Sequence, residues 1–137
     1  MHSIKYRTYY EDTDAQGVVY YANYLRFIER ARTEYLREFG YQQKELLEKN
    51  VIFIVRKLSI KYLSPVYLDE IIKIESNLKK VKKLSFNFLQ EIYNEDNQKV
   101  FEAEVFCGSI DAETRKPSML PLEIQKKMIE ESSWPTN

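Results

Sequence analysis

The chain has 137 residues, a length that gives one domain with a hydrophobic core of its own. Apolar residues make up 44% and charged residues 31%, with only 3 Gly and 4 Pro, so the composition excludes a disordered or fibrous protein. The 21 basic and 21 acidic side chains cancel, whereas a protein that binds a phosphate backbone normally carries a basic excess. We therefore expect no nucleic-acid partner.

The cysteine content and the charge spacing indicate where the chain works. Its one cysteine, Cys107, cannot form an internal disulfide, which favours the reducing cytoplasm. The longest stretch without a charge, residues 15–25, has 11 residues, fewer than the ~20 that span a bilayer. The first seven residues lack the apolar segment of a secretory signal. We expect a single cytoplasmic domain over residues 1–137 without a membrane span.

The only histidine, His2, lies at a terminus that we expect to fray. This leaves no histidine for a Ser-His-Asp or Cys-His nucleophile and none for a zinc site. Any catalysis must therefore use carboxylates, hydroxyls, lysines or backbone dipoles, and we expect neither a metal nor a bound cofactor.

The first third of the chain predicts a strand, a loop and a long helix. Residues 4–10 are rich in β-branched and aromatic side chains, as in a strand, and residues 11–17 are polar. From about Tyr21 to Phe39 apolar residues recur at helical spacing, and Gly40 follows as a C-terminal cap. Residues 42–49 predict a short second helix.

From Val51 onward apolar and polar residues alternate with a period of two, as in half-buried strands. The pattern is clearest around residues 58–62, 72–78 and 84–88, and a fourth strand over residues 99–110 is apolar on both faces, as in the interior of a sheet. Residues 120–131 predict a final helix, and residues 132–137 a loose tail. Short connections make the strands antiparallel, so we expect an α+β fold with a sheet curled around one buried helix.

The chemistry is concentrated in the segment D-T-D-A-Q-G-V-V-Y-Y-A-N-Y, which begins at Asp12 and leads into the helix. A carboxylate here lies near the positive end of the helix dipole and near N–H groups without intrahelical partners. Those N–H groups could polarise a carbonyl oxygen, and Gly17 would let the backbone approach a ligand closely. One acid with free amides is a minimal site for attack on an acyl group.

Two other interpretations of this loop compete. In the first, Asp12 and Asp14 only make turn and capping hydrogen bonds, which is common for such loops. In the second, the loop binds calcium, because Asp12, Asp14 and Gly17 match positions 1, 3 and 6 of an EF-hand loop. Position 12 would be Asn23 in place of the required bidentate Glu, which argues against calcium.

The longer run from Asp12 to Leu36, D-T-D-A-Q-G-V-V-Y-Y-A-N-Y-L-R-F-I-E-R-A-R-T-E-Y-L, resembles the signature of hotdog-fold thioesterases of the 4-hydroxybenzoyl-CoA thioesterase group. The resemblance is greatest to the YbgC-type acyl-CoA thioesterases. It implies a hotdog fold, in which a five-stranded antiparallel sheet wraps around a long central helix. It also implies a homo-oligomer, a dimer or a tetramer, with acyl-CoA as substrate.

The resemblance assigns roles to particular residues. Asp14 is implied to be catalytic, as nucleophile or general base, and the backbone N–H of Tyr21 to polarise the thioester carbonyl. Many YbgC-type proteins have a histidine where this chain has Tyr21, so an imidazole contribution is lost while a backbone contribution survives. Gly17 completes the expected catalytic loop, and four residues beside it are expected to bind the acyl group: Val18, Val19, Tyr20 and Tyr24.

The run K-K-V-K-K at residues 79–83 places four cations between two predicted strands. Such a run is commonly a solvated turn. Coenzyme A carries a diphosphate and a 3′-phosphate, and related enzymes bind them with basic residues at a similar place, so Lys82 and Lys83 are the candidate phosphate ligands.

Together these patterns predict an acyl-CoA thioesterase that releases a free acid and coenzyme A. We expect fatty acyl-CoA before aromatic acyl-CoA, with a link to lipid or phospholipid metabolism. The alternative is a non-catalytic protein of the same fold that binds acyl-CoA or acyl carrier protein.

Overall fold

The computed structural model describes residues 1–38, 40 and 43–132. Five antiparallel strands form one sheet in the order β1-β3-β4-β5-β2. The strands are β1 (His2–Arg7), β2 (Val51–Tyr62), β3 (Ile71–Val81), β4 (Ser85–Tyr93) and β5 (Lys99–Asp111). The helices are α1 (Asn23–Glu38), α2 (Gln43–Glu48) and α3 (Leu122–Glu131), with a 3-10 turn, η1, at Tyr10–Asp12. This confirms the α+β fold and its hotdog arrangement.

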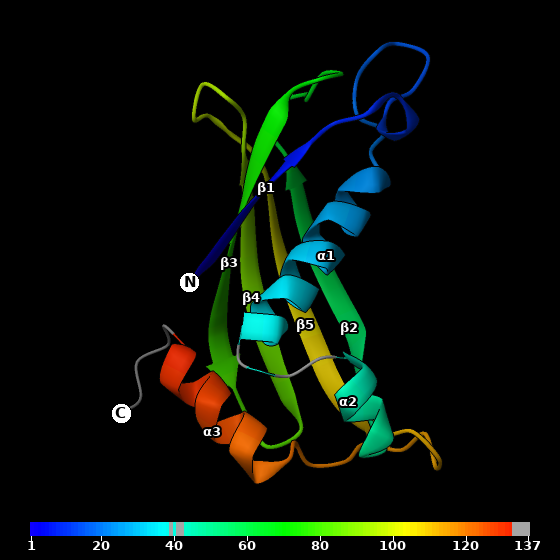
Figure 1. The fold of residues 1–137 in the computed structure, drawn as a ribbon, viewed down its shortest axis with the longest axis vertical. Coiled ribbons are helices and arrows are strands. Elements are labelled where there is room, and N and C mark those ends of the chain that lie inside the picture. Colours follow the sequence, from blue (N-terminus) through cyan, green and yellow to red (C-terminus); the bar gives the residue numbers. More distant parts are fainter. Residues whose placement is uncertain (39, 41–42, 133–137) are drawn as a thin grey trace.

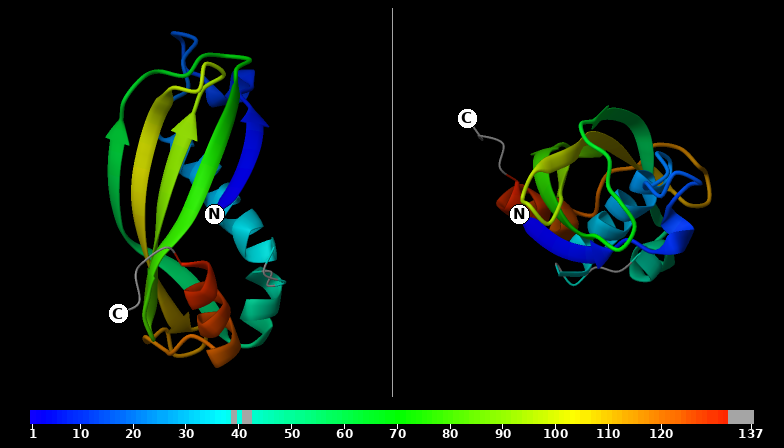
Figure 2. Two further views of the ribbon diagram at one scale, coloured as in Figure 1. Left: turned by 90° about the vertical axis from the view of Figure 1, so that its left-hand side faces the viewer. Right: turned by 90° about the horizontal axis from the view of Figure 1, so that it is seen from above.

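The sheet curves around α1, as the view from above in Figure 2 shows. One face of α1 is buried, with apolar residues three or four positions apart that meet the concave side of the sheet. These residues are Tyr24, Phe27, Ile28, Ala31, Tyr35 and Leu36. Helix α3 lies across the lower end of the sheet in Figure 1 and contributes the fully buried Ile124 and Met128.

The predicted helices agree with the structure within about two residues at each described end. Gly40 has φ +84° and donates its N–H to the carbonyl of Arg37, which confirms its capping role. Phe39 and Gln42, the two predicted ends on either side of Gly40, lie outside the described residues, as does the predicted tail from residue 133 onward.

The prediction for the N-terminus was wrong. His2 is only 7% exposed, pairs with Ser76 in β3 and stacks on the Tyr35 ring at 5.4 Å between centroids. The strand also ends at Arg7, earlier than the predicted residue 10. After Arg7 the backbone of Thr8 still bonds Glu70 and Asp69, and its hydroxyl donates to the carbonyl of Tyr67.

The expectation of half-buried strands holds for β3 and β4 but fails for most of β2. Leu58 and Tyr62, predicted to face the core, are 38% and 49% exposed. The cause is position in the sheet, because β2 is an edge strand whose outer side has no neighbouring strand among the described residues. The doubly apolar β5 lies between β4 and β2, which confirms its interior place.

Candidate active site

The loop that carries the candidate acid is a small closed hairpin between η1 and α1, at the upper end of Figure 1. The N–H of Asp14 donates to the carbonyl of Val18 at 2.9 Å, and the N–H of Gly17 donates to the carbonyl of Asp14 at 3.0 Å. Gly17 has φ +79°, a conformation that favours glycine, so it supplies the turn that the sequence suggested. Val18 bridges to Tyr67, which attaches the hairpin to the segment before β3.

The two aspartates of the loop make different hydrogen bonds. The carboxylate of Asp12 accepts the N–H of Tyr9 at 2.8 Å, and its carbonyl accepts the N–H of Tyr20 and the side-chain amide of Asn23. Asp12 therefore ties η1 to the beginning of α1 with both its side chain and its backbone. It has the structural role that the turn and capping interpretation gave to both residues.

Asp14 is exposed, and one of its oxygens, Oδ1, accepts the N–H of Gln16 at 2.8 Å. The turn interpretation is thus correct for this oxygen. Within the described part of the chain, Oδ2 makes no hydrogen bond and no basic group pairs with the carboxylate. The Gln16 contact fixes the orientation of the carboxylate and leaves one oxygen available to a ligand.

The N–H groups of Tyr21 and Ala22 are free donors at the entry to α1, since neither has an acceptor among the described residues. The N–H of Tyr20, by contrast, donates to Asp12 and that of Asn23 to Tyr20. The carbonyl of Tyr21 accepts the Tyr62 hydroxyl at 2.8 Å. The sequence analysis missed this role of Tyr62. A tyrosine at the end of an edge strand was its only signal.

The four predicted acyl-binding residues are divided between the surface and the core. Tyr20 is exposed and its ring packs on that of Tyr21 at 4.7 Å, while Val18 is half-buried. Val19 and Tyr24 are buried in the core, at 6% and 3% exposure. The Tyr24 ring stacks on Phe101 at 4.9 Å, and burial raises the pKa of its phenol to about 12.

The predicted phosphate ligands lie at the opposite end of the sheet. Lys82 lines a pocket of about 570 Å³ together with three further cations that the prediction omitted: Arg56, Lys57 and Lys80. Lys83 does not line it, although its carbonyl accepts the N–H of Leu120. In one protomer the Asp14 hairpin is at the top of Figure 1 and the turn between β3 and β4 at the bottom, so the structure does not bring the two together.

Two irregularities in the strands build this cationic pocket. The pairing register shifts between Val55 and Lys57 in β2 and between Leu78 and Lys80 in β3. Arg56 then lies over Gly108, where an added Cβ would be 2.8 Å from its Cδ. A glycine inside the apolar strand was the signal for this close approach.

No group of three His, Cys, Asp or Glu side chains in the described part of the chain could hold a metal ion. No described helix is long and apolar enough to cross a membrane.

Comparison with known proteins agrees with this geometry. Residues 10–128 match the model of the thioesterase-like superfamily. The chain is 43% identical over 118 residues to the acyl-CoA thioester hydrolase YbgC of Escherichia coli, covering 86% of this chain and 88% of that one. It is 40% identical over 124 residues to the acyl-CoA thioesterase YbgC of Haemophilus influenzae, covering 90% of each.

Solved structures show the same fold. A probable thioesterase from Bartonella henselae superposes with a TM-score of 0.82 at 33% identity, over 88% of this chain and 98% of that one. A DHNA-CoA thioesterase from Staphylococcus aureus superposes with a TM-score of 0.87 at 24% identity, over 94% and 91%. The chain therefore belongs to the thioesterase-like superfamily, as a YbgC-like protein with the hotdog fold.

Proposed function

We propose that this protein hydrolyses acyl-CoA thioesters to a free acid and coenzyme A, with Asp14 and the N–H of Tyr21 at the reacting centre. The observation that carries the proposal is the pairing of an oriented carboxylate, which has one free oxygen, with a free N–H on the same short loop. A thioester is already an activated acyl group, so a carboxylate and a hydrogen-bond donor are sufficient for its hydrolysis.

Each group has a defined task in this mechanism. The N–H of Tyr21 donates to the carbonyl oxygen of the thioester and stabilises the negative charge that develops there. Oδ2 of Asp14 either attacks the acyl carbon, forming an anhydride that water then hydrolyses, or accepts a proton from the attacking water. Either route expels the thiolate of coenzyme A, which takes up a proton. Only the backbone of Tyr21 takes part in this mechanism.

Coenzyme A would place its phosphates on the pocket lined by Arg56, Lys57, Lys80 and Lys82. Arg56, Lys57 and Lys82 pair with no carboxylate in the described part of the chain. This supports an anion-binding role for Lys82 and extends that role to the neighbouring cations of the pocket. The same role has weaker support for Lys83, which does not line the pocket.

A complete site would then need two subunits, because in one protomer the Asp14 hairpin lies at one end of the sheet, whereas the cationic pocket extends from the middle of β2 to the turn between β3 and β4. The free edge of β2 offers the means. Two copies paired antiparallel about the middle of β2 would place the Tyr62 end of one strand beside the Val51 end of the other. The hairpin of one copy would then approach the cationic pocket of its partner. We therefore propose a homodimer, or a tetramer built from such dimers.

The substrate class is a further part of the proposal. We favour fatty acyl-CoA, with aromatic acyl-CoA second and a role in lipid or phospholipid metabolism. The relatives from Escherichia coli and Haemophilus influenzae are named as acyl-CoA hydrolases, and a structural neighbour from Staphylococcus aureus as a DHNA-CoA thioesterase. Acyl carrier protein is the second candidate partner, since an acidic carrier would complement the cationic pocket.

Replacing Asp14 by Asn should lower kcat by ~10² or more, because the variant keeps the shape and the Gln16 contact but loses the charge. Thiol release from a panel of acyl-CoAs measures the effect. Asp12→Asn removes the same charge from a structural position and should be milder. Near-normal turnover in Asp14→Asn would contradict the mechanism and favour another acid. No turnover in the wild-type protein, together with binding of acyl-CoA, would favour the non-catalytic alternative.

Tyr62→Phe should lower kcat by about tenfold with little change in KM. The substitution removes the hydrogen bond from the Tyr62 hydroxyl to the carbonyl of Tyr21, which helps to position the Tyr21 N–H. The matched control is Tyr67→Phe, whose exposed hydroxyl makes no hydrogen bond with the described residues. Steady-state kinetics on one acyl-CoA separate the two parameters. An unchanged kcat in Tyr62→Phe would mean that the loop holds its shape without this bond.

The cationic pocket can be tested with a double variant in which both Arg56 and Lys82 are replaced by Ala. KM for acyl-CoA should rise several-fold and kcat should stay close to its original value, since phosphates far from the reacting carbonyl contribute mainly uniform binding. Lys83→Ala, next in sequence but outside the pocket, is the control. An acyl-N-acetylcysteamine is a second substrate that lacks the nucleotide, so the Arg56 and Lys82 substitutions should not change the kinetics of its hydrolysis. Equal losses on both substrates would show instead that the acyl site is disturbed.

The shared site makes a further prediction. Light scattering should give a mass of at least two 16.5 kDa chains at micromolar concentration. Subunits with Asp14→Asn can be mixed with subunits of the Arg56/Lys82 double variant. Each hybrid dimer should contain one intact site, in which the double variant supplies Asp14 and the Asp14→Asn subunit supplies the cations. Activity at low substrate should therefore rise above that of either parent. A monomeric mass, or no recovery in proven hybrids, would place the site within one chain.

A further inference from the structure

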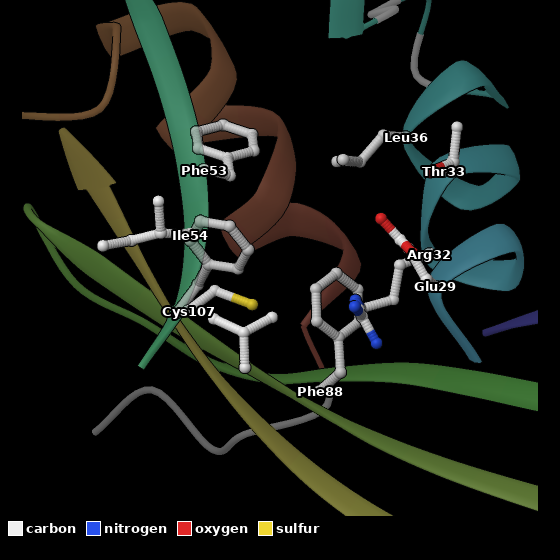
Figure 3. A pocket seen from close by; sticks show the side chains of 10 residues that line it. Glu29, Arg32, Thr33, Leu36, Phe53, Ile54, Phe88 and Cys107 are labelled. Atoms are coloured by element: carbon white, nitrogen blue, oxygen red, sulfur yellow. The ribbon is translucent and has the colours of Figure 1, made fainter. Parts of the chain in front are cut away.

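A separate pocket lies on the inner side of the sheet, between α1 and the strands β2, β4 and β5 (Figure 3). Its volume is about 90 Å³. The helix contributes the polar side chains Glu29, Arg32 and Thr33. The strands contribute mostly apolar ones, among them Phe53, Val55, Phe86, Phe88 and Cys107. The proposed mechanism uses none of these residues.

Arg32 extends from α1 toward Phe88 and Cys107 in this pocket (Figure 3). Its Nη1 donates to Oε1 of Gln90 at 2.9 Å, and the guanidinium makes no other hydrogen bond or ion pair with the described residues. A guanidinium has five N–H donors, so four remain for a ligand or for water.

The position of Arg32 is fixed from behind by a neutral group. Gln90 is fully buried, and its amide nitrogen donates to the carbonyl of Ile28 and to the hydroxyl of Ser76, both at 2.9 Å. These two bonds leave the amide oxygen to face Arg32. The guanidinium is therefore held in one place. The carboxylate of Glu29, one turn earlier on α1, lines the same pocket but forms no ion pair with Arg32 in the described part of the chain.

Burial lowers the pKa of Arg32, because a cation loses hydration there and no nearby anion compensates fully. Charge-assisted hydrogen bonds are stronger in such surroundings than in water. An anion that entered the pocket would meet a preorganised, partly dehydrated cation.

We propose that this pocket binds the carboxylate of a small organic acid, with Arg32 as its anion-binding group. The carboxylate would accept two parallel N–H bonds from the guanidinium, and a short apolar body would lie against Phe53, Phe86 and Val55. A cavity of roughly 150 Å³ holds the six carbons of benzene, so this smaller one would enclose about four heavy atoms, and the rest of a bound acid of six heavy atoms would extend toward the open side of the pocket. Butyrate is the matching probe. The inference is independent of the proposed hydrolysis, although the acid released by that reaction has the same chemistry.

Titration of butyrate followed by calorimetry and by amide NMR shifts tests the site. Butyramide, of similar shape but neutral, should bind at least tenfold more weakly. Arg32→Met should weaken butyrate binding at least tenfold, whereas Arg26→Met, which removes the same charge from an exposed position on α1, should not. The largest shifts should lie at Arg32, Thr33 and Phe88, which line this pocket and not the cationic one. Equal binding of acid and amide, no saturable binding, or shifts centred on Arg56 and Lys82 would overturn the proposal.

Arg32→Met also leaves the buried oxygen of Gln90 without its partner, so loss of binding in this variant could reflect a damaged fold. Thr33→Phe avoids that ambiguity, because it fills the pocket from the helix and leaves the bond between Arg32 and Gln90 in place. It should abolish butyrate binding at an unchanged thermal unfolding midpoint. Wild-type affinity in Thr33→Phe would show that butyrate binds elsewhere, and the inference would fail.

Discussion

The burial of one face of α1 in the concave sheet is the contact on which the rest of the molecule depends. Tyr24 at its first turn stacks on Phe101 of β5, and Tyr35 near its end packs against Phe88 of β4 and His2 of β1. These contacts fix the helix at both ends. Because the helix cannot slide or rotate, the loop before it is held relative to the edge of β2.

That constraint places the candidate chemistry on a rigid support. Asp12 ties η1 to the first turn of α1, and Tyr62 at the end of β2 ties the carbonyl of Tyr21 to the sheet. Asp14 and the N–H of Tyr21 lie between these two attachments. The free carboxylate oxygen and the free donor are thus oriented before any substrate arrives, which is how preorganised sites lower a reaction barrier.

The sheet separates three environments. Its inner side faces the half-buried Arg32 of α1, which is supported by Gln90. The bulges of β2 and β3 build a pocket of exposed cations around Arg56 and Lys82. Phe86 and Cys107 line both pockets, so the two are neighbours across a thin wall. The Asp14 hairpin is remote from both in one protomer, which makes a second copy part of the proposed site.

Local pattern was sufficient for much of this molecule. The helical spacing from Tyr24 to Leu36, Gly40 after it and the alternation in the later strands each depend on neighbours within a few residues, so sequence alone predicted the helices, the strands and the α+β fold. The candidate acid Asp14 was selected from a sequence motif as well, since a long motif marked its loop. Exposure could not be predicted in this way. His2 is buried because β3 lies beside it, and Leu58 is exposed because β2 has no outer neighbour.

Contacts between distant segments were decided only by the tertiary structure. Tyr62 donates a hydrogen bond to Tyr21, which is 41 residues away in the sequence, and Arg32 donates one to Gln90, which is 58 residues away. The gathering of Arg56 with Lys82 depends on two register shifts that periodicity does not specify. A sequence pattern records which residues share a face of their own element. Which faces meet is set by the packing of α1 into the curved sheet. That packing leaves the Asp14 hairpin at one end of the sheet and the cations between the middle of β2 and the turn between β3 and β4.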